Sequence, residues 1–127
     1  GLGRELAEGS LSFLEGAPVE KLPGGSFFMS RYQQQKYNES PEAYGPFAFA
    51  ATNLVIDAIE KVGPNRKRVI AELNKTRDRD SIIGKITFDD HGQNVVSLIT
   101  KYVAQDGKWV VWEDSEYATG KRKLKGR

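Results

Sequence analysis

The 127-residue sequence contains no cysteine and a single histidine, His91. Without cysteine, a disulfide framework, a thiolate metal site and a thiol nucleophile are all excluded, and the cellular compartment is left open. Long apolar runs are also lacking. The longest apolar segment, residues 46–59, is interrupted by Thr52, Asn53 and Asp57 and is too short to span a bilayer.

The sequence also lacks an arrangement typical of a catalytic site, which usually needs a nucleophile with a base, a carboxylate pair or a metal. We interpret His91 as a solvent-facing turn residue, and a triad with Ser81 or Ser97 is disfavoured. Asp89 and Asp90 do not converge with it on a metal, because adjacent strand residues point to opposite faces. We therefore expect a non-enzyme, with no catalytic residue, no metal ligand and no cofactor.

The net charge of +2 hides an asymmetry along the chain. Five of the 19 basic residues lie in residues 121–127, which leaves 14 basic against 17 acidic residues over residues 1–120. A basic tail is compatible with a nucleic-acid or lipid contact. This tail lacks the interleaved aromatic residues that stack on bases, however. We expect one domain over residues 1–120, a solvated and disordered tail over residues 121–127, and no nucleic-acid partner.

Hydrophobic periodicity predicts one strand and three helices in the first two-thirds of the chain. The strand is expected over residues 10–14 and the helices over residues 26–37, about 43–62, and 66–76. Ser26 is the expected N-cap of the first helix, and Phe47 begins a wide apolar stripe on the second. The loop before Ser26 ends in Gly24-Gly25, which lacks the strand-before-helix context of a phosphate-binding loop. Residues 77–80 are expected to be a solvated connector.

The last third of the chain is predicted to form a β-meander. Residues 85–88 alternate between polar and apolar side chains, and residues 89–92 supply turn chemistry. A second strand is expected over residues 95–104, and Asp106-Gly107 turns it into a third over residues 108–113. The strand at residues 10–14 then has no partner sheet, which favours a fragment of a larger α/β fold.

Particular motifs add a family resemblance to this pattern. The sequence G-K-I-T-F-D-x-x-G from Gly84, followed by D-G-K-W from Asp106, resembles the C-terminal region of the leucine/isoleucine/valine-binding protein family. These proteins are the extracytoplasmic receptors of branched-chain amino-acid ABC transporters and are type I periplasmic binding proteins. Three upstream elements are similar to elements of the family and occur in the same order. They are the A-E-G motif and strand from Ala7, the helix over residues 26–37, and the aromatic-led helix start at residues 44–51. The resemblance therefore covers roughly residues 2–113.

This resemblance implies an α/β fold, here a fragment of two doubly wound lobes with one strand, three helices and a C-terminal meander. Residues 2–16 would end one lobe, residues 26–88 would belong to the other, and the chain near residues 102–112 would cross back. An amino acid would bind in the cleft between the lobes, and hinge closure would create a shape that a membrane permease recognises. The location would be periplasmic or extracytoplasmic, with any secretion signal removed or upstream, because no basic-then-apolar leader is present.

Only one position can be carried over from the family's ligand site with any specificity. Tyr44, at the start of the long helix, matches the place of an aromatic ring against the ligand, and Phe47 is a weaker candidate that begins the apolar stripe. Most ligand-contacting residues of the family lie in segments that this chain does not contain. We therefore expect an incomplete site, little or no binding by the chain alone, and either association with the remainder of a binding protein or self-association.

Two alternatives remain open. The same fold also serves as a ligand-sensing module attached to signalling proteins, and an autonomous α+β interaction domain could share the hairpin alone. Trp109 and Trp112 are interpreted as packing residues of the last strand. The residues present do not determine which solute is bound.

Overall fold

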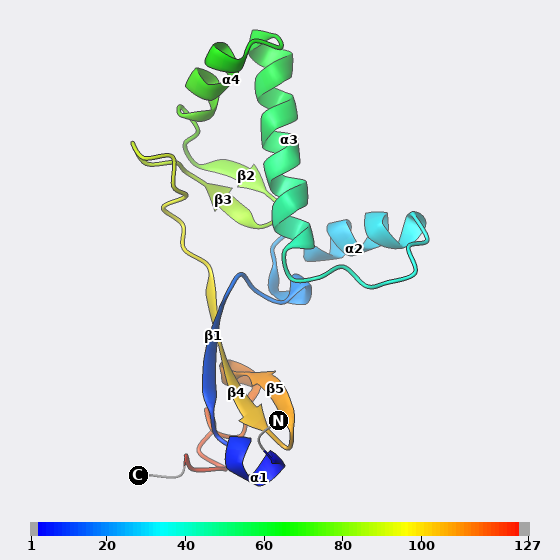
Figure 1. The fold of residues 1–127 in the computed structure, drawn as a ribbon, viewed down its shortest axis with the longest axis vertical. Helices are drawn as coiled ribbons and strands as arrows, with labels where there is room; N and C mark the ends of the chain where they lie inside the picture. The colour runs from blue at the N-terminus through cyan, green and yellow to red at the C-terminus, as the bar shows by residue number, and fades with distance from the viewer. Residues whose placement is uncertain (1–2, 125–127) are drawn as a thin grey trace. The chain divides into compact units, whose positions relative to one another are not determined.

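A computed structural model of the chain describes residues 3–124, with the backbone alone at Arg4. It divides into two compact units (Figure 1). The first combines the N-terminal segment up to Ala17 with the C-terminal segment from Leu98, and the second comprises Pro18–Ser97. This division agrees with the expected course of the chain through two lobes, except that the return begins at Leu98, earlier than the predicted residues 102–112. Within residues 3–124, no helix has the combination of length and hydrophobicity that a bilayer span requires.

The first unit is built on a three-stranded antiparallel sheet in the order β1-β4-β5. Its elements are the short helix α1 (Arg4–Ala7), the strands β1 (Leu11–Glu15), β4 (Ile99–Gln105) and β5 (Lys108–Val111), and the 3-10 turn η2 (Trp112–Asp114). The central strand β4 carries the core residues Val103, which is fully buried, and Ala104. The predicted turn at Asp106-Gly107 is confirmed, and both residues have positive φ, as a two-residue type I′ hairpin turn requires.

The strand predicted at residues 10–14 exists as β1, but the expectation that it lacks a partner is wrong. β1 pairs antiparallel with β4, with Leu11 opposite Val103 and Glu15 opposite Ile99. The pairing continues beyond the strand, because the Gly9 amide donates to the Ala104 carbonyl at 2.8 Å and the Gly16 amide donates to that of Leu98 at 2.7 Å. Hydrophobic patterning identified both strands, but it carries no information on which strands pair.

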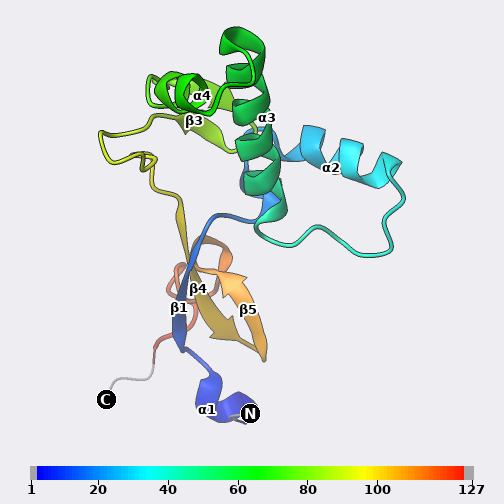
Figure 2. The same ribbon diagram turned by 45° about the horizontal axis from the view of Figure 1, so that its top comes forward.

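The second unit packs three helices with a small hairpin (Figure 2). Its elements are η1 (Val19–Lys21), α2 (Gly25–Gln34), α3 (Gly45–Val62), α4 (Arg66–Leu73), β2 (Arg79–Ser81) and β3 (Gly84–Ile86). α3 contacts α4, and its buried positions follow one face at Ala50, Leu54 and Ala58. Other positions of the predicted apolar stripe are solvent-accessible, since Val55 and Ile59 are 40% and 37% exposed.

The predicted meander is wrong in its first half. β3 pairs with β2, with Arg79 opposite Ile86, and β2 lies in the segment expected to be a solvated connector. The turn chemistry itself is confirmed, because the Asp89 carboxylate accepts hydrogen bonds from the amides of His91 and Gln93 at 2.9 and 2.8 Å. The second strand begins only at Ile99, and its register follows β1 rather than β3.

The tryptophans and the basic tail differ from expectation in their surroundings. Trp112 contacts the Lys101 ammonium, which lies 3.5 Å from its ring centroid, but it begins the 3-10 turn η2 and is not part of the last strand as predicted. Trp109 is 59% exposed, because it lies on the edge strand β5. Disorder of residues 121–127 stays a prediction: residues 125–127 lie outside the described part, whereas Arg122 is held by the ion pairs described below.

The glycine pair before α2 has a packing role. Gly24, rather than the predicted Ser26, is the N-cap of α2, and its amide donates to the Ile82 carbonyl at 2.9 Å. A Cβ at Gly24 would lie 2.5 Å from the Cα of Ile82, and one at Gly25 would overlap the carbonyl oxygen of Val19. The two glycines therefore allow η1 and the β2–β3 hairpin to approach the start of α2 closely.

We predict that Gly25→Ala destabilises the second unit by about 3 kcal/mol, because a rigid backbone carbonyl must move to admit the methyl group. Urea unfolding followed by helical circular dichroism measures the change, since α2, α3 and α4 all belong to this unit. Gly3→Ala is the control, because nothing lies within 4 Å of a Cβ at that position. Equal stability of the two variants would contradict the packing role.

Candidate functional site

Tyr44, the main residue predicted to touch a ligand, is the N-cap of α3. Its carbonyl accepts the first hydrogen bond of the helix from Ala48 at 2.9 Å, and Pro46 occupies the first turn, where a missing amide costs little. The Tyr44 side chain is 57% exposed, and none of the described residues hydrogen-bonds to its hydroxyl. The backbone of Tyr44 is thus fixed while its ring remains available to a solute or another segment.

Phe47, the second predicted residue, lies one turn further along α3 and is half-buried. No ring contact joins it to Tyr44 within residues 3–124. Its burial agrees with the interpretation of Phe47 as mainly a packing residue at the start of the apolar stripe. Ligand contact by Tyr44 or Phe47 stays a prediction.

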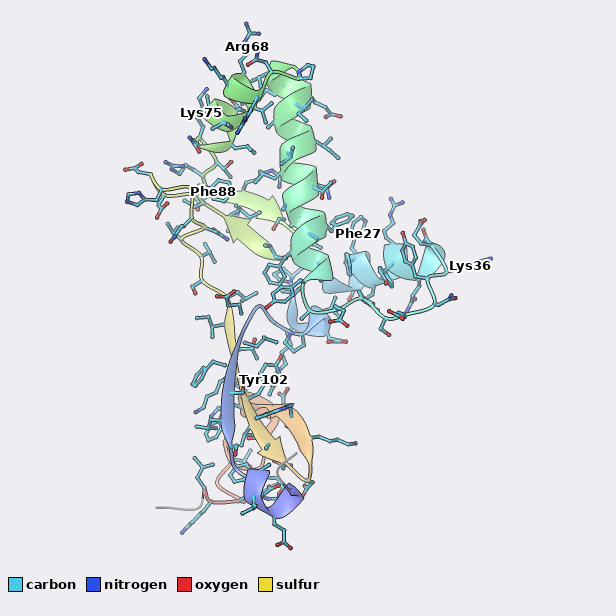
Figure 3. All side chains as sticks on the ribbon, viewed as in Figure 1. Phe27, Lys36, Arg68, Lys75, Phe88 and Tyr102 are labelled. Carbon is cyan, nitrogen blue, oxygen red and sulfur yellow. The ribbon has the colours of Figure 1, made fainter. Side chains whose placement is uncertain are left out.

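The structure brings together a different set of aromatic residues, from α2, the loop after it and α3. Phe28 packs edge-on against Phe49 at 5.7 Å between ring centroids. Tyr32 packs at a tilt against Phe28 at 5.9 Å and against Tyr37 at 4.9 Å. Together with Phe27 these rings line a cavity of about 630 Å³, hereafter the aromatic pocket. Figure 3 shows Phe27 on α2 and Lys36 just beyond its end. The sequence signal was the aromatic density of residues 27–37, but only the fold adds Phe49.

A second cluster, the Arg122 cluster, lies in the first unit and consists of Glu8, Asp106, Glu116, Tyr117 and Arg122. The Arg122 guanidinium donates to Glu8 at 2.6 Å, to both oxygens of Asp106 at 3.0 and 3.2 Å, and to Glu116 at 3.0 Å. The buried Tyr117 donates its hydroxyl proton to Glu8 at 2.6 Å. One cation thereby bridges three carboxylates from separate segments.

The electrostatics of the Arg122 cluster follow from these contacts. The hydrogen bond from Tyr117 and then that from Arg122 lower the pKa of Glu8 below 4.5, its ordinary value. The bond to Glu8 raises the pKa of the Tyr117 hydroxyl, and the bonds to Asp106 and Glu8 raise that of Arg122. Every charged group of the cluster is committed to a partner in the cluster, so its chemistry is that of a structural clamp between the N- and C-terminal segments.

Metal ligation has no counterpart in the part of the chain that the structure describes. No group of three or more histidine, aspartate or glutamate side chains there is placed to hold a metal ion. His91 is exposed on its loop, with its amide bonded to Asp89.

Comparison with models of known protein families finds none that matches, and comparison with curated protein sequences finds no match. Solved structures do match. The leucine-binding protein LivK from Thermotoga maritima shares 24% sequence identity with this chain at a TM-score of 0.64. An ABC-transporter substrate-binding protein from Desulfitobacterium hafniense in complex with leucine has 20% identity and a TM-score of 0.65. The branched-chain amino-acid transporter substrate-binding protein LivJ from Streptococcus pneumoniae, in complex with isoleucine, has 22% identity and a TM-score of 0.65.

Each of these matches covers 84% of the present chain. The chain itself spans 30–32% of the length of these structures, which is about a third. The predicted fold class is therefore confirmed: this is an α/β chain with the fold of part of a periplasmic binding protein. At this level of identity the likeness establishes the fold, and the function is argued separately below.

We predict that Glu8→Gln lowers the stability of the first unit at pH 7 and that this deficit shrinks as the pH falls. Because folding lowers the pKa of Glu8, its stabilising contribution is fully present above about pH 4.5 and is lost as the pH falls through the folded-state pKa. Urea unfolding followed by tryptophan fluorescence isolates this unit, because Trp109 and Trp112, the two tryptophans, both belong to it. Exposed Glu15→Gln is the control, and a deficit that is equally large at pH 3 and pH 7 would refute the clamp.

Proposed function

We propose that this chain is part of the solute-binding component of an ABC importer. The observation that carries the proposal is the fold, which follows ABC-transporter binding proteins over 84% of the chain. Two of those structures hold leucine and isoleucine, which suggests a branched-chain or similar amino acid as the ligand. Such receptors hold a solute in a cleft and close around it, with no bond made or broken.

Within this proposal, Tyr44 is the residue of the chain assigned to the ligand. Its backbone is fixed by the first turn of α3, and its ring is more than half exposed, so the ring can cover an apolar side chain at small entropic cost. Phe47 supports it from the helix as a packing residue. The chain offers no acidic residue that we assign to the ligand's ammonium group, so the site needs groups from outside these 127 residues.

The proposed partners follow from this role. They are the membrane permease of the importer and the remainder of the binding protein, and the location is periplasmic or extracytoplasmic. Large apolar side chains on both faces of the sheet of the first unit support further covering segments: Phe13 and Ile99, 65% and 60% exposed, share one face, and Trp109, 59% exposed, lies on the other. Exposed apolar groups at this density mark surfaces that other protein segments bury. Self-association would cover them where that remainder is absent.

We predict that calorimetric titration of the 127-residue chain with leucine or isoleucine gives no saturable heat, whereas a longer protein that contains this chain binds one of them. In that longer protein, Tyr44→Ala is expected to weaken binding about tenfold, the loss of roughly 1.4 kcal/mol of ring contact. Tyr44→Phe should retain most of the affinity, because the ring and not the hydroxyl makes the contact.

The matched control is Tyr37→Ala, which removes a tyrosine of similar exposure from the same unit and should leave amino-acid affinity unchanged. Micromolar binding by the 127-residue chain alone would show that the site is complete in it. A longer protein that binds no amino acid would overturn the importer assignment.

A further inference from the structure

The aromatic pocket is large enough to hold a small molecule and is built within the second unit alone. Its volume of about 630 Å³ lies in the range of small-molecule sites. Five of the nine lining residues carry aromatic rings, which are Phe27, Phe28, Tyr32, Tyr37 and Phe49. Neither Tyr44 nor Phe47 lines it, so it is separate from the site proposed above.

The rings differ in their availability. Phe28 is buried and held between Phe49 and Tyr32, which makes it the fixed floor of the pocket. Phe27 and Tyr37 are 52% and 62% exposed, so a large part of each ring is open to contact. A planar aromatic ligand in the pocket would contact these rings in the offset and edge-on arrangements that aromatic pairs prefer.

The charge at the pocket determines which charged group a ligand should carry. Arg31 is the one charged residue among the nine that line the pocket, and its guanidinium carbon lies 5.5 Å from the centroid of the Phe27 ring. This contact holds the guanidinium N–H donors of Arg31 at the aromatic wall. Arg31 has no ion-pair partner within the described part of the chain. A planar guanidinium at an apolar wall is suited to a carboxylate.

The remaining polar groups offer an ammonium group no charged partner. The Tyr32 hydroxyl donates to the Glu39 carbonyl at 3.0 Å, and the Asn53 amide donates to the Phe49 carbonyl at 2.8 Å. No carboxylate lines the pocket. An amino-acid zwitterion would therefore leave its ammonium group without a charged partner and close to Arg31, at a cost that a simple carboxylic acid avoids.

We propose that the aromatic pocket binds small aryl carboxylates, with the aromatic ring of the ligand against Phe27, Phe28 and Phe49 and its carboxylate at Arg31. Binding here is independent of the amino-acid site, because it uses none of its residues. Aromatic rings by themselves also attract cations, so the sign of the charge preference is the decisive property. The guanidinium predicts preference for an anion.

The test uses the full 127-residue chain labelled with ¹⁵N and the probe 3-phenylpropanoate, followed by two-dimensional NMR. Saturable shifts confined to backbone amides of residues 27–37, 45 and 49–53 are expected, with a dissociation constant on the order of 1 mM, which is typical of a ligand with so few atoms. Phenylalanine, 2-phenylethylamine and the neutral 3-phenylpropanamide provide the zwitterionic, cationic and uncharged arms. Each should bind at least severalfold more weakly than the acid.

Arg31→Gln should weaken binding of the acid about tenfold and leave binding of the amide unchanged, because only the charge-assisted contact is lost. Arg31→Lys should recover part of the affinity. Arg68→Gln is the matched control, since Arg68 is an exposed arginine of the same unit that lies on α4 and not at the pocket (Figure 3).

Four results would overturn the proposal. The first three are the absence of saturable shifts in the acid titration, shifts centred outside the pocket, and an affinity of the Arg31→Gln variant for the acid equal to that of the unmodified chain. The fourth is binding of 2-phenylethylamine as tight as that of the acid, which would assign the pocket to cations. The importer assignment is tested with a different ligand, a longer protein and Tyr44, so either proposal can fail while the other stands.

Discussion

The backbone pairing of β1 with β4 is the interaction on which the organisation of this chain depends. It joins Leu11–Glu15 to Ile99–Val103, so that strands more than 80 residues apart share one ladder. Closing so long a loop costs entropy, which must be recovered by the contacts that the ladder brings together. Val103, fully buried at the centre, and the hydrogen bonds that extend the ladder through Gly9 and Gly16 supply them. In the sequence, residues 18–97, which form the second unit, are inserted between the two segments that build the sheet.

The Arg122 cluster reinforces the same pairing from its end. Glu8 precedes β1, Asp106 occupies the turn after β4, and Tyr117 and Arg122 follow β5. Because the three carboxylates converge on one guanidinium, loss of the arginine would leave mutually repelling charges rather than a merely missing contact. Arg122, which the sequence analysis placed in a solvated basic tail, is thus part of the folded structure. In the inserted unit, the closely packed pair Gly24-Gly25 has the comparable role of letting separate segments meet.

Both proposed sites lie in the inserted unit. Tyr44, proposed to contact the solute, stands at the start of α3 with a fixed backbone and an exposed ring. The aromatic pocket depends on α2 and α3 packing through Phe28 and Phe49, and Arg31, its single charged lining residue, is the basis of the charge preference proposed for it. Two aromatic sites on one unit can therefore differ in ligand class, because ring contacts supply affinity while the nearest charge selects the partner.

Local patterns in the sequence determined most elements of this protein. The strand at β1, the helices α2, α3 and α4, the turns at Asp89 and Asp106-Gly107 and the α/β character all follow from periodicity and turn residues that act over a few positions. The tertiary structure alone decided which strands pair. β3 pairs with β2 and β4 pairs with β1, although a meander is equally compatible with the alternation of polar and apolar side chains along the strands. It also decided the contact of Phe49 with Phe28 and of Arg122 with Glu8. A side chain's pattern reveals that it will be buried or paired, but its partner is set by long-range packing, which no local sequence window contains.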